Sequence, residues 1–263
     1  MAKVRVDVLL VERGLAESRS QAQRLVMAGQ VRADGQLVPK PASTVDPEAL
    51  LEVDQGPPFV SRGGEKLEAA LATFNIEVNG LICADVGAST GGFTDCLLQN
   101  GAKRVYAIDV GNGILHWKLR QDPRVVVMED MNARYVERLP EAVELTTIDV
   151  SFISLKILLP VVRGWFPTSG GQVVALIKPQ FEAGREEATR GEGVIRDPEI
   201  HRQVLREVLG FAQNDGYAVR DLMRSPLMGA KGNVEFLAWL NYPGTTEIST
   251  EDLIDEITRE SRT

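Results

Sequence analysis

Four charged residues stand in apolar surroundings, and their types are those that move protons in enzymes. Asp149 and Lys178 each follow an apolar run that is typical of a buried strand. Lys66 lies in an expected helix, and Glu235 lies in an apolar stretch, where a lone acid needs a partner. Two amines and two carboxylates in one place would form a charge-balanced cluster able to activate a weak nucleophile. Singly, each is equally well explained as a surface charge or a structural ion pair.

Three more acids end three predicted strands, at Asp85, Asp109 and Asp130. Asp109 comes 24 residues after Asp85 (109 − 85), and a carboxylate at that point can accept hydrogen bonds from ribose hydroxyls. Asp85 is expected to hold a cationic amino group, directly or through water. Asp130 and Met131 are expected to read an adenine edge. Together these groups match the ammonium, ribose and adenine of S-adenosylmethionine, although each acid could instead cap the following turn or helix.

The segment after Asp85 is rich in glycine and is expected to carry the cofactor against its backbone. The residues assigned to this loop are Gly87, Ser89, Gly91, Gly92 and Phe93. The loop is not the G-x-G-x-x-G pattern of dinucleotide-binding proteins, and it lacks the Lys-Ser/Thr of a phosphate-binding loop. This favours S-adenosylmethionine over a nicotinamide cofactor.

These residues need a scaffold that brings strand ends together. Five apolar runs alternate with helical patterns, which predicts an α/β, Rossmann-like domain with a mostly parallel, doubly wound sheet. Ligands of such sheets bind beyond the carboxyl ends of the strands. The predicted strands are Leu81–Val86, Arg104–Asp109, Val125–Glu129, Leu145–Val150 and Gln172–Ile177.

The N-terminal 45 residues differ from the rest in charge, with seven basic and four acidic side chains in a chain of net charge −8. Two short helices, the second opened by the capping pattern Ser18/Gln21, and a hairpin at Asp34-Gly35 predict a small α+β unit. The asymmetry suggests a basic module on an acidic body, or a chance excess of a few charges.

The expected domain organisation follows these changes in composition. We place the small domain at 1–56, ending at Gly56, a stiff linker that begins with Pro57-Pro58 at 57–61, and the large domain at 62–243. An acidic tail covers 244–263 and forms either a docked helix or a frayed end.

Composition excludes several classes of protein. The 263 residues are 44% hydrophobic and 25% charged, as in globular proteins, and no run is long enough to span a membrane. Two cysteines form no disulfide framework, and the two histidines lack metal-ligand spacing, so we expect a cytoplasmic protein without metal or membrane. Nothing in the sequence predicts an oligomeric state.

The N-terminal motifs resemble the S4 RNA-binding domain, through the segments 5–15, 18–22, 28–31 and Asp34-Gly35. That family presents basic side chains to structured RNA, which a rigid helical surface can track by shape. The resemblance implies contacts to RNA phosphates by Arg5, Arg13, Arg19, Arg24 and Arg32.

The ordered set Lys66, Asp149, Lys178 and Glu235 resembles the tetrad of FtsJ-type 2′-O-methyltransferases. With the S4-like front end, residues 3–242 resemble the TlyA family of ribosomal RNA methyltransferases, once described as haemolysins. The resemblance implies methyl transfer from S-adenosylmethionine to a cytidine 2′-hydroxyl in assembled ribosomal subunits. The matching segments are 61–67, 85–93, 149–154, 178–182, 193–198 and 229–236.

The tetrad has a chemical interpretation. Lys178 is the expected general base, aided by the neighbouring Lys66 ammonium and by partial burial. Asp149 would orient Lys178, Glu235 would hold Lys66, and Arg62 is an additional RNA-contact candidate. Some relatives carry an aromatic, basic linker where this chain has Gly-Pro-Pro-Phe-Val, which puts any coupling through that linker in question.

Two other functions stay open at this point. One is an RNA-binding ribosome assembly factor with weak or no catalysis, against which the complete set of seven site residues speaks. The other is a membrane-lysing protein, which would need an amphipathic or spanning segment that the sequence does not show.

Overall fold

The computed structural model describes residues 3–54, 56–184 and 192–259. The chain divides into two compact units, residues 1–58 and 59–263. Each unit has a hydrophobic core of its own.

The first unit is the predicted small α+β domain. Helices α1 (Val6–Glu12) and α2 (Arg19–Met27) pack together, and the Ser18 side chain caps α2 by accepting from the Gln21 amide. The strands pair as β1–β4 and as β3-β2-β5, all antiparallel. Their bounds are β1 Val4–Arg5, β2 Val31–Ala33, β3 Gln36–Leu37, β4 Thr44–Val45 and β5 Leu51–Val53.

The second unit is built on a seven-stranded sheet of order β11-β12-β10-β9-β6-β7-β8. The five strands from β10 to β8 are parallel, and β12 and β11 are added antiparallel at one edge. The strands are β6 Ile82–Val86, β7 Arg104–Ile108, β8 Val125–Met128, β9 Leu145–Ile148, β10 Gly171–Ile177, β11 Ala218–Arg224 and β12 Phe236–Tyr242.

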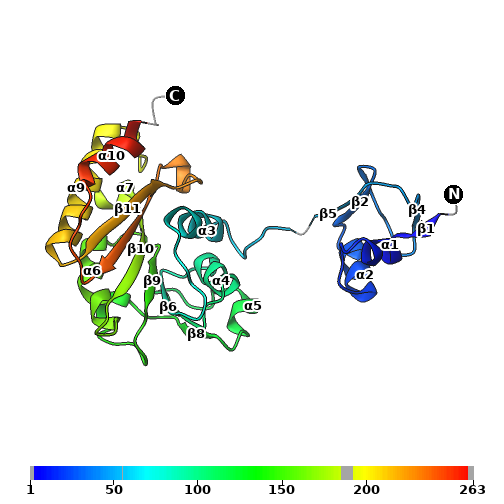
Figure 1. The fold of residues 1–263 in the computed structure, drawn as a ribbon, viewed down its shortest axis with the longest axis horizontal. Coiled ribbons are helices and arrows are strands. Elements are labelled where there is room, and N and C mark those ends of the chain that lie inside the picture. Colours follow the sequence, from blue (N-terminus) through cyan, green and yellow to red (C-terminus); the bar gives the residue numbers. More distant parts are fainter. Residues whose placement is uncertain (1–2, 55, 185–191, 260–263) are drawn as a thin grey trace. The chain divides into compact units, whose positions relative to one another are not determined.

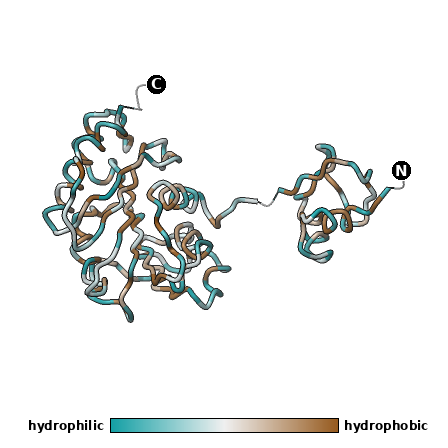
Figure 2. Tube along the Cα trace, viewed as in Figure 1, coloured by the Kyte–Doolittle hydropathy of each residue, from teal (hydrophilic) through white to brown (hydrophobic). Residues whose placement is uncertain are grey.

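Helices cover both faces of this sheet, as Figure 1 shows, and each face has its own core. One layer holds α3 (Gly63–Phe74), α4 (Gly92–Gln99) and α5 (Trp117–Arg120). The other contains α6 (Leu155–Val162) and α9 (Pro198–Asn214), with α10 (Thr250–Arg259) against α9 and β11. The hydropathy colouring of Figure 2 shows apolar segments gathered along the sheet between these layers. The doubly wound α/β prediction is therefore confirmed.

Short helices complete the connections. They are α7 (Pro179–Glu182) and the 3-10 turns at Ala133–Tyr135, Arg163–Trp165 and Ala230–Gly232. No helix among the described residues is long and apolar enough to cross a membrane.

The acidic tail forms a docked helix as far as Arg259, the last described residue. Ile254 is fully buried and Ile257 nearly so. Arg206 of α9 forms an ion pair with Glu251 at 2.8 Å. The docked alternative therefore holds for this part of the tail.

Candidate active site

The sheet register brings the predicted site residues to one edge. Ile148 of β9 pairs with both Val86 of β6 and Ala175 of β10, so the residues after these strands emerge side by side. Ile177 pairs with Phe236 in the antiparallel β10–β12 ladder, which sets Lys178 across from Glu235. The ends of parallel strands thus supply Asp149 and Lys178, and Glu235 directly precedes the antiparallel strand β12.

Lys66 and Glu235 form a buried ion pair. The Lys66 ammonium donates to Glu235 Oε2 at 2.6 Å, and their side chains are 11% and 2% exposed. Lys66 reaches this point from the first turns of α3, whose apolar face (Leu67, Ala70, Leu71) packs on the sheet. Burial of a charge requires such a partner, so each residue explains the burial of the other.

Lys178 and Asp149 form the second pair. Lys178 Nζ lies 2.5 Å from Asp149 Oδ1 and also donates to Ser151 Oγ at 3.3 Å. Its side chain is 12% exposed and that of Asp149 is 23% exposed. The Lys178 ammonium lies 5.8 Å from the centre of the Phe181 ring.

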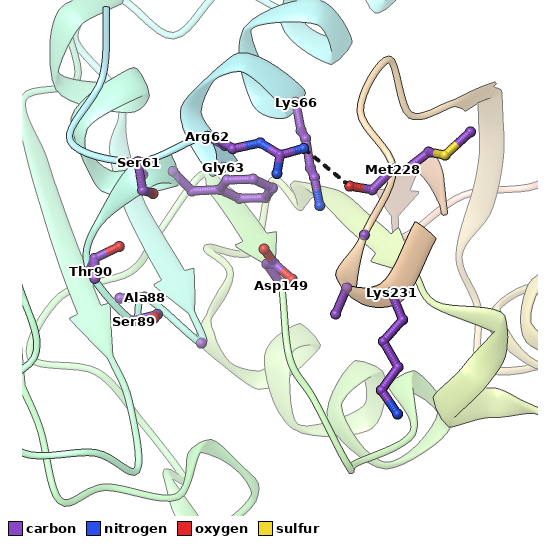
Figure 3. Close-up of a pocket in the computed structure, with 15 residues that line it drawn as sticks. Ser61, Arg62, Gly63, Lys66, Ala88, Ser89, Thr90, Asp149, Met228 and Lys231 are labelled. Atoms are coloured by element: carbon purple, nitrogen blue, oxygen red, sulfur yellow. Dashed lines mark hydrogen bonds between the residues drawn. The ribbon is translucent and has the colours of Figure 1, made fainter. Parts of the chain in front are cut away.

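A first cavity of about 370 Å³ opens beside these pairs. Figure 3 shows the Lys66 side chain reaching down past Arg62 toward the cavity, with Asp149 below it. Lys178 and Glu235 lie behind the wall, each bonded to a lining residue. The lining residues are Ser61, Arg62, Gly63, Lys66, Gly87, Ala88, Ser89, Thr90, Gly92, Phe93, Asp149, Met228, Gly229, Ala230 and Lys231.

The glycine loop owes its sequence to close contacts. Gly87 has φ +83°, and a Cβ there would lie 2.4 Å from the Asp149 carbonyl oxygen. A Cβ on Gly92 would lie 2.3 Å from Ser61 Oγ, and one on Gly91 would lie 2.2 Å from Leu119. Glycine therefore lets the strand end, the start of α3 and α5 approach this loop.

A second cavity, of about 600 Å³, shares Gly87, Ser89 and Asp149 with the first. Its walls are mostly apolar, with Asp109 as an acid at one side. Asp109 accepts from the Ser89 and Gly111 amides at 2.8 and 2.7 Å. Met131 lines this cavity, together with residues that the sequence analysis does not assign: Val110, Ile114, Asn132, Phe152, Ile153 and Ile157.

Two of the predicted acids line neither the first nor the second cavity. Asp85 is fully buried under the glycine loop, where it accepts from Thr94 Oγ1 at 2.6 Å and Thr147 Oγ1 at 3.1 Å. Burial raises the pKa of its carboxyl to about 7. Both carboxylate oxygens accept from hydroxyl groups, and Asp85 lines neither cavity, so its contact with a ligand amino group, directly or through water, stays a prediction.

Asp130 is the other of these acids, and its contact with an adenine edge stays a prediction. It has φ +53° and accepts from the Asn112 side chain, and it borders an open hollow outside the second cavity. Its neighbour Glu129, which we did not assign, accepts from the Gly113 amide at 2.9 Å and is paired with Arg120. The pKa of Glu129 is lowered to about 2, and the largest cause is its hydrogen bond with Arg120. Glu129 thus fixes the loop that carries Ile114, a role with no signal in the sequence beyond two consecutive acids.

In the first unit, a buried acid organises two of the predicted arginines. Asp7 is fully buried and accepts from Arg5 at 2.9 Å, Arg19 at 3.0 Å and Gln23 at 3.0 Å. The pKa of the Asp7 carboxyl lies well below its usual range, and the largest cause is the hydrogen bond with Arg5. Arg5 and Arg19 remain 43% and 55% exposed, so Asp7 presents two guanidinium groups at the surface.

The other arginines make different contacts. Arg13 donates to the carbonyls of Ala49 and Pro47, which gives it a structural role in joining α1 to the segment before β5. Arg24 donates to Ser20 and Arg32 to the Gly35 carbonyl. Arg62, in the second unit, donates to the Met228 carbonyl at 3.4 Å across the first cavity.

The model of the FtsJ-like methyltransferases matches residues 59–242, and that of the S4 domain matches residues 4–51. This chain belongs to the FtsJ-like methyltransferase family. The S4 match confirms the identity of the basic N-terminal module.

Relatives of this FtsJ-like methyltransferase match along nearly their whole length. The 16S/23S rRNA (cytidine-2′-O)-methyltransferase TlyA of Mycobacterium tuberculosis is 45% identical over 98% of this chain and 97% of its own. Hemolysin A of Brachyspira hyodysenteriae is 42% identical over 89% of this chain and 98% of its own. A solved candidate hemolysin from Streptococcus thermophilus is 48% identical, with a TM-score of 0.74, and covers 99% of this chain and 96% of its own. The predicted resemblance to the TlyA family is confirmed.

Proposed function

We propose that this FtsJ-like methyltransferase uses S-adenosylmethionine to methylate the 2′-hydroxyl of a cytidine in ribosomal RNA within ribosomal subunits. The observation that carries the proposal is the pair of ion pairs, Lys66–Glu235 and Lys178–Asp149, joined at one cavity by Lys66 and Asp149. The relative that is 45% identical is named for this reaction.

The second cavity suits the nucleoside part of the cofactor. Asp109 can accept from two ribose hydroxyls, and Met131 and Ile114 supply apolar surface for an adenine ring. The shared residues Gly87, Ser89 and Asp149 then border the sulfonium end. When bound, the cofactor supplies an electrophilic methyl group on a good leaving group, so the protein has to align and deprotonate the nucleophile.

The first cavity suits the target ribose. A hydroxyl entering it meets Lys66 and Asp149, with Lys178 held behind Asp149 at 2.5 Å. Lys178 is the proposed general base, Asp149 fixes the direction of its Nζ, and Glu235 holds Lys66. In its neutral form, Lys178 would accept the proton of the 2′-hydroxyl while the cofactor, when bound, would give its methyl group to the 2′-oxygen and leave as the neutral thioether after the sulfur–methyl bond breaks.

Binding of large RNA is assigned to the S4 domain and to Arg62. Arg5 and Arg19 are held together by Asp7, which favours a contact to adjacent phosphates. Arg24 and Arg32 remain candidates for phosphate contacts, since each makes an exposed hydrogen bond to a nearby residue. Arg13 already donates to two backbone carbonyls. Phosphate contacts of this kind position the enzyme without reading the sequence.

The test is to map 2′-O-methylation along ribosomal RNA from cells with and without this chain. A cytidine methylated only in the presence of the chain is the expected result. Identical maps would contradict the proposal and would favour an RNA-binding assembly factor without catalysis.

A further inference from the structure

Gln180 is buried next to Glu235, although the reaction as described does not use it. It belongs to α7, two residues after Lys178, and its side chain is turned toward β12. Gln180 is 8% exposed, and its Nε2 donates to Glu235 Oε1 at 3.2 Å. A polar side chain buried to this degree is retained only where its bond matters to the structure or the site.

The contact with Gln180 completes the surroundings of the Glu235 carboxylate. One oxygen, Oε2, takes the Lys66 ammonium, and the other, Oε1, takes the Gln180 amide. Gly229 closes another side, since a Cβ there would lie 1.9 Å from Oε1. The carboxylate therefore cannot rotate without losing a bond or displacing the loop that lines the first cavity.

The helix that carries Gln180 is itself fixed. Glu182, at its end, accepts from Ser154 Oγ at 2.6 Å and from the Leu155 amide at 2.7 Å. The Lys178 carbonyl accepts from the Phe181 amide at 2.9 Å. Gln180 is thus held rigidly to the backbone of Lys178, and its amide spans from that backbone to the Lys66–Glu235 pair.

We propose that Gln180 is a positioning residue that sets the Lys66–Glu235 pair relative to Lys178 by donating a hydrogen bond to Glu235. This inference rests on the proposed function, because Gln180 would position two members of the tetrad that is proposed to carry the reaction. Among the described residues, the Gln180 Oε1 atom has no hydrogen-bond partner, so its donor group carries the role. The side chain at position 180 must donate a hydrogen bond, as a neutral amide or a protonated carboxyl does. A group that only accepts does not replace it.

Two variants separate this role from simple packing. Gln180→Leu keeps the size of the side chain and removes the donor, and we expect kcat to fall about 10- to 100-fold, with little change in the Kd for S-adenosylmethionine or for RNA. Gln180→Glu places a second carboxyl beside Glu235, which can donate only while the pair retains a proton. The ratio of its kcat to that of wild type is therefore expected to fall as pH rises from 6 to 9, whereas the same ratio for Gln180→Leu stays constant.

The matched control is Gln172→Leu. Gln172 lies at the other end of β10 and accepts from the Trp239 indole at 2.9 Å, so this variant also loses one side-chain bond, away from the site. Its kcat is expected to stay within twofold of wild type. A Gln180→Leu kcat within twofold of wild type, a loss confined to ligand affinity, or a flat pH ratio for Gln180→Glu would each overturn the positioning role. Absence of methyl transfer by the wild-type protein would instead overturn the proposed function, and this role with it.

Discussion

Asp85 offers a quantitative test of the burial beneath the glycine loop. The carboxyl is fully buried, its nearest partners are the hydroxyls of Thr94 and Thr147, and burial raises its pKa from 3.8 to about 7. A pKa higher in the folded state means that folding takes up a proton between these values. The contribution of Asp85 to the free energy of unfolding is therefore greatest below pH 3.8, and it is lost as the pH rises through 7. At 1.36 kcal/mol for each pH unit, the full effect is about 4 kcal/mol.

Asp85→Asn removes the titration while keeping the size and polarity of the side chain. We expect the free energy of unfolding of wild type, relative to this variant, to fall by about 3 kcal/mol between pH 5 and pH 8 and then to level off. Urea unfolding followed by tryptophan fluorescence measures this difference, and Trp117, Trp165 and Trp239 all report on the second unit. Parallel pH profiles for the two proteins over this range would refute the reasoning, because a carboxyl with an ordinary pKa makes no such difference.

Three further substitutions test other contacts. Glu235→Gln leaves the Lys66 ammonium buried without its counter-charge and is expected to destabilise the second unit by about 3–5 kcal/mol, as measured by the same unfolding assay. Gly87→Ala places a Cβ 2.4 Å from a strand-end carbonyl, so we expect about 1–2 kcal/mol of backbone strain together with a large loss of turnover in a methyl-transfer assay. Asp7→Ala releases Arg5 and Arg19, and RNA affinity measured by filter binding is expected to fall about tenfold, with a shallower salt dependence.

Each of the three has a result that would contradict it. Unchanged stability of Glu235→Gln would mean that the ion pair is solvated. Gly80→Ala is the control for strain alone, since Gly80 has φ +79° and no atom within 4 Å of an added Cβ. Equal activity losses in the two glycine variants would remove the case for close approach at Gly87. Wild-type RNA affinity in Asp7→Ala would show that the two arginines do not act as a pair.

Much of the fold could be predicted because its signals are local. The parallel strands are largely apolar runs that end at or near acids or a lysine, and the Ser18 cap bonds to its predicted helix. The strands β11 and β12 were not predicted, although the apolar stretch around Glu235 was noted. Their antiparallel pairing depends on contacts between distant segments, such as Ile177 with Phe236, that periodicity does not encode.

The site shows the same division. Strand ends identified Asp109 and Lys178 because a parallel sheet gathers such residues at one edge. The burial of Asp85 depends on the positions of the Thr94 and Thr147 hydroxyls. The position of Asp130 outside the second cavity depends on its own left-handed backbone and on its hydrogen bond from Asn112. These are side-chain contacts between separate segments, and no single segment contains them.

The most direct test of the central claim uses Lys178→Ala. Wild-type and variant proteins are incubated with ribosomal subunits and labelled S-adenosylmethionine, and 2′-O-methylation is mapped while cofactor affinity is measured by calorimetry. The account predicts methylation of one cytidine site by wild type, none by the variant, and a Kd for S-adenosylmethionine within a few-fold of wild type. Retained turnover by Lys178→Ala would contradict the assignment of the proton acceptor and, with it, the proposed mechanism.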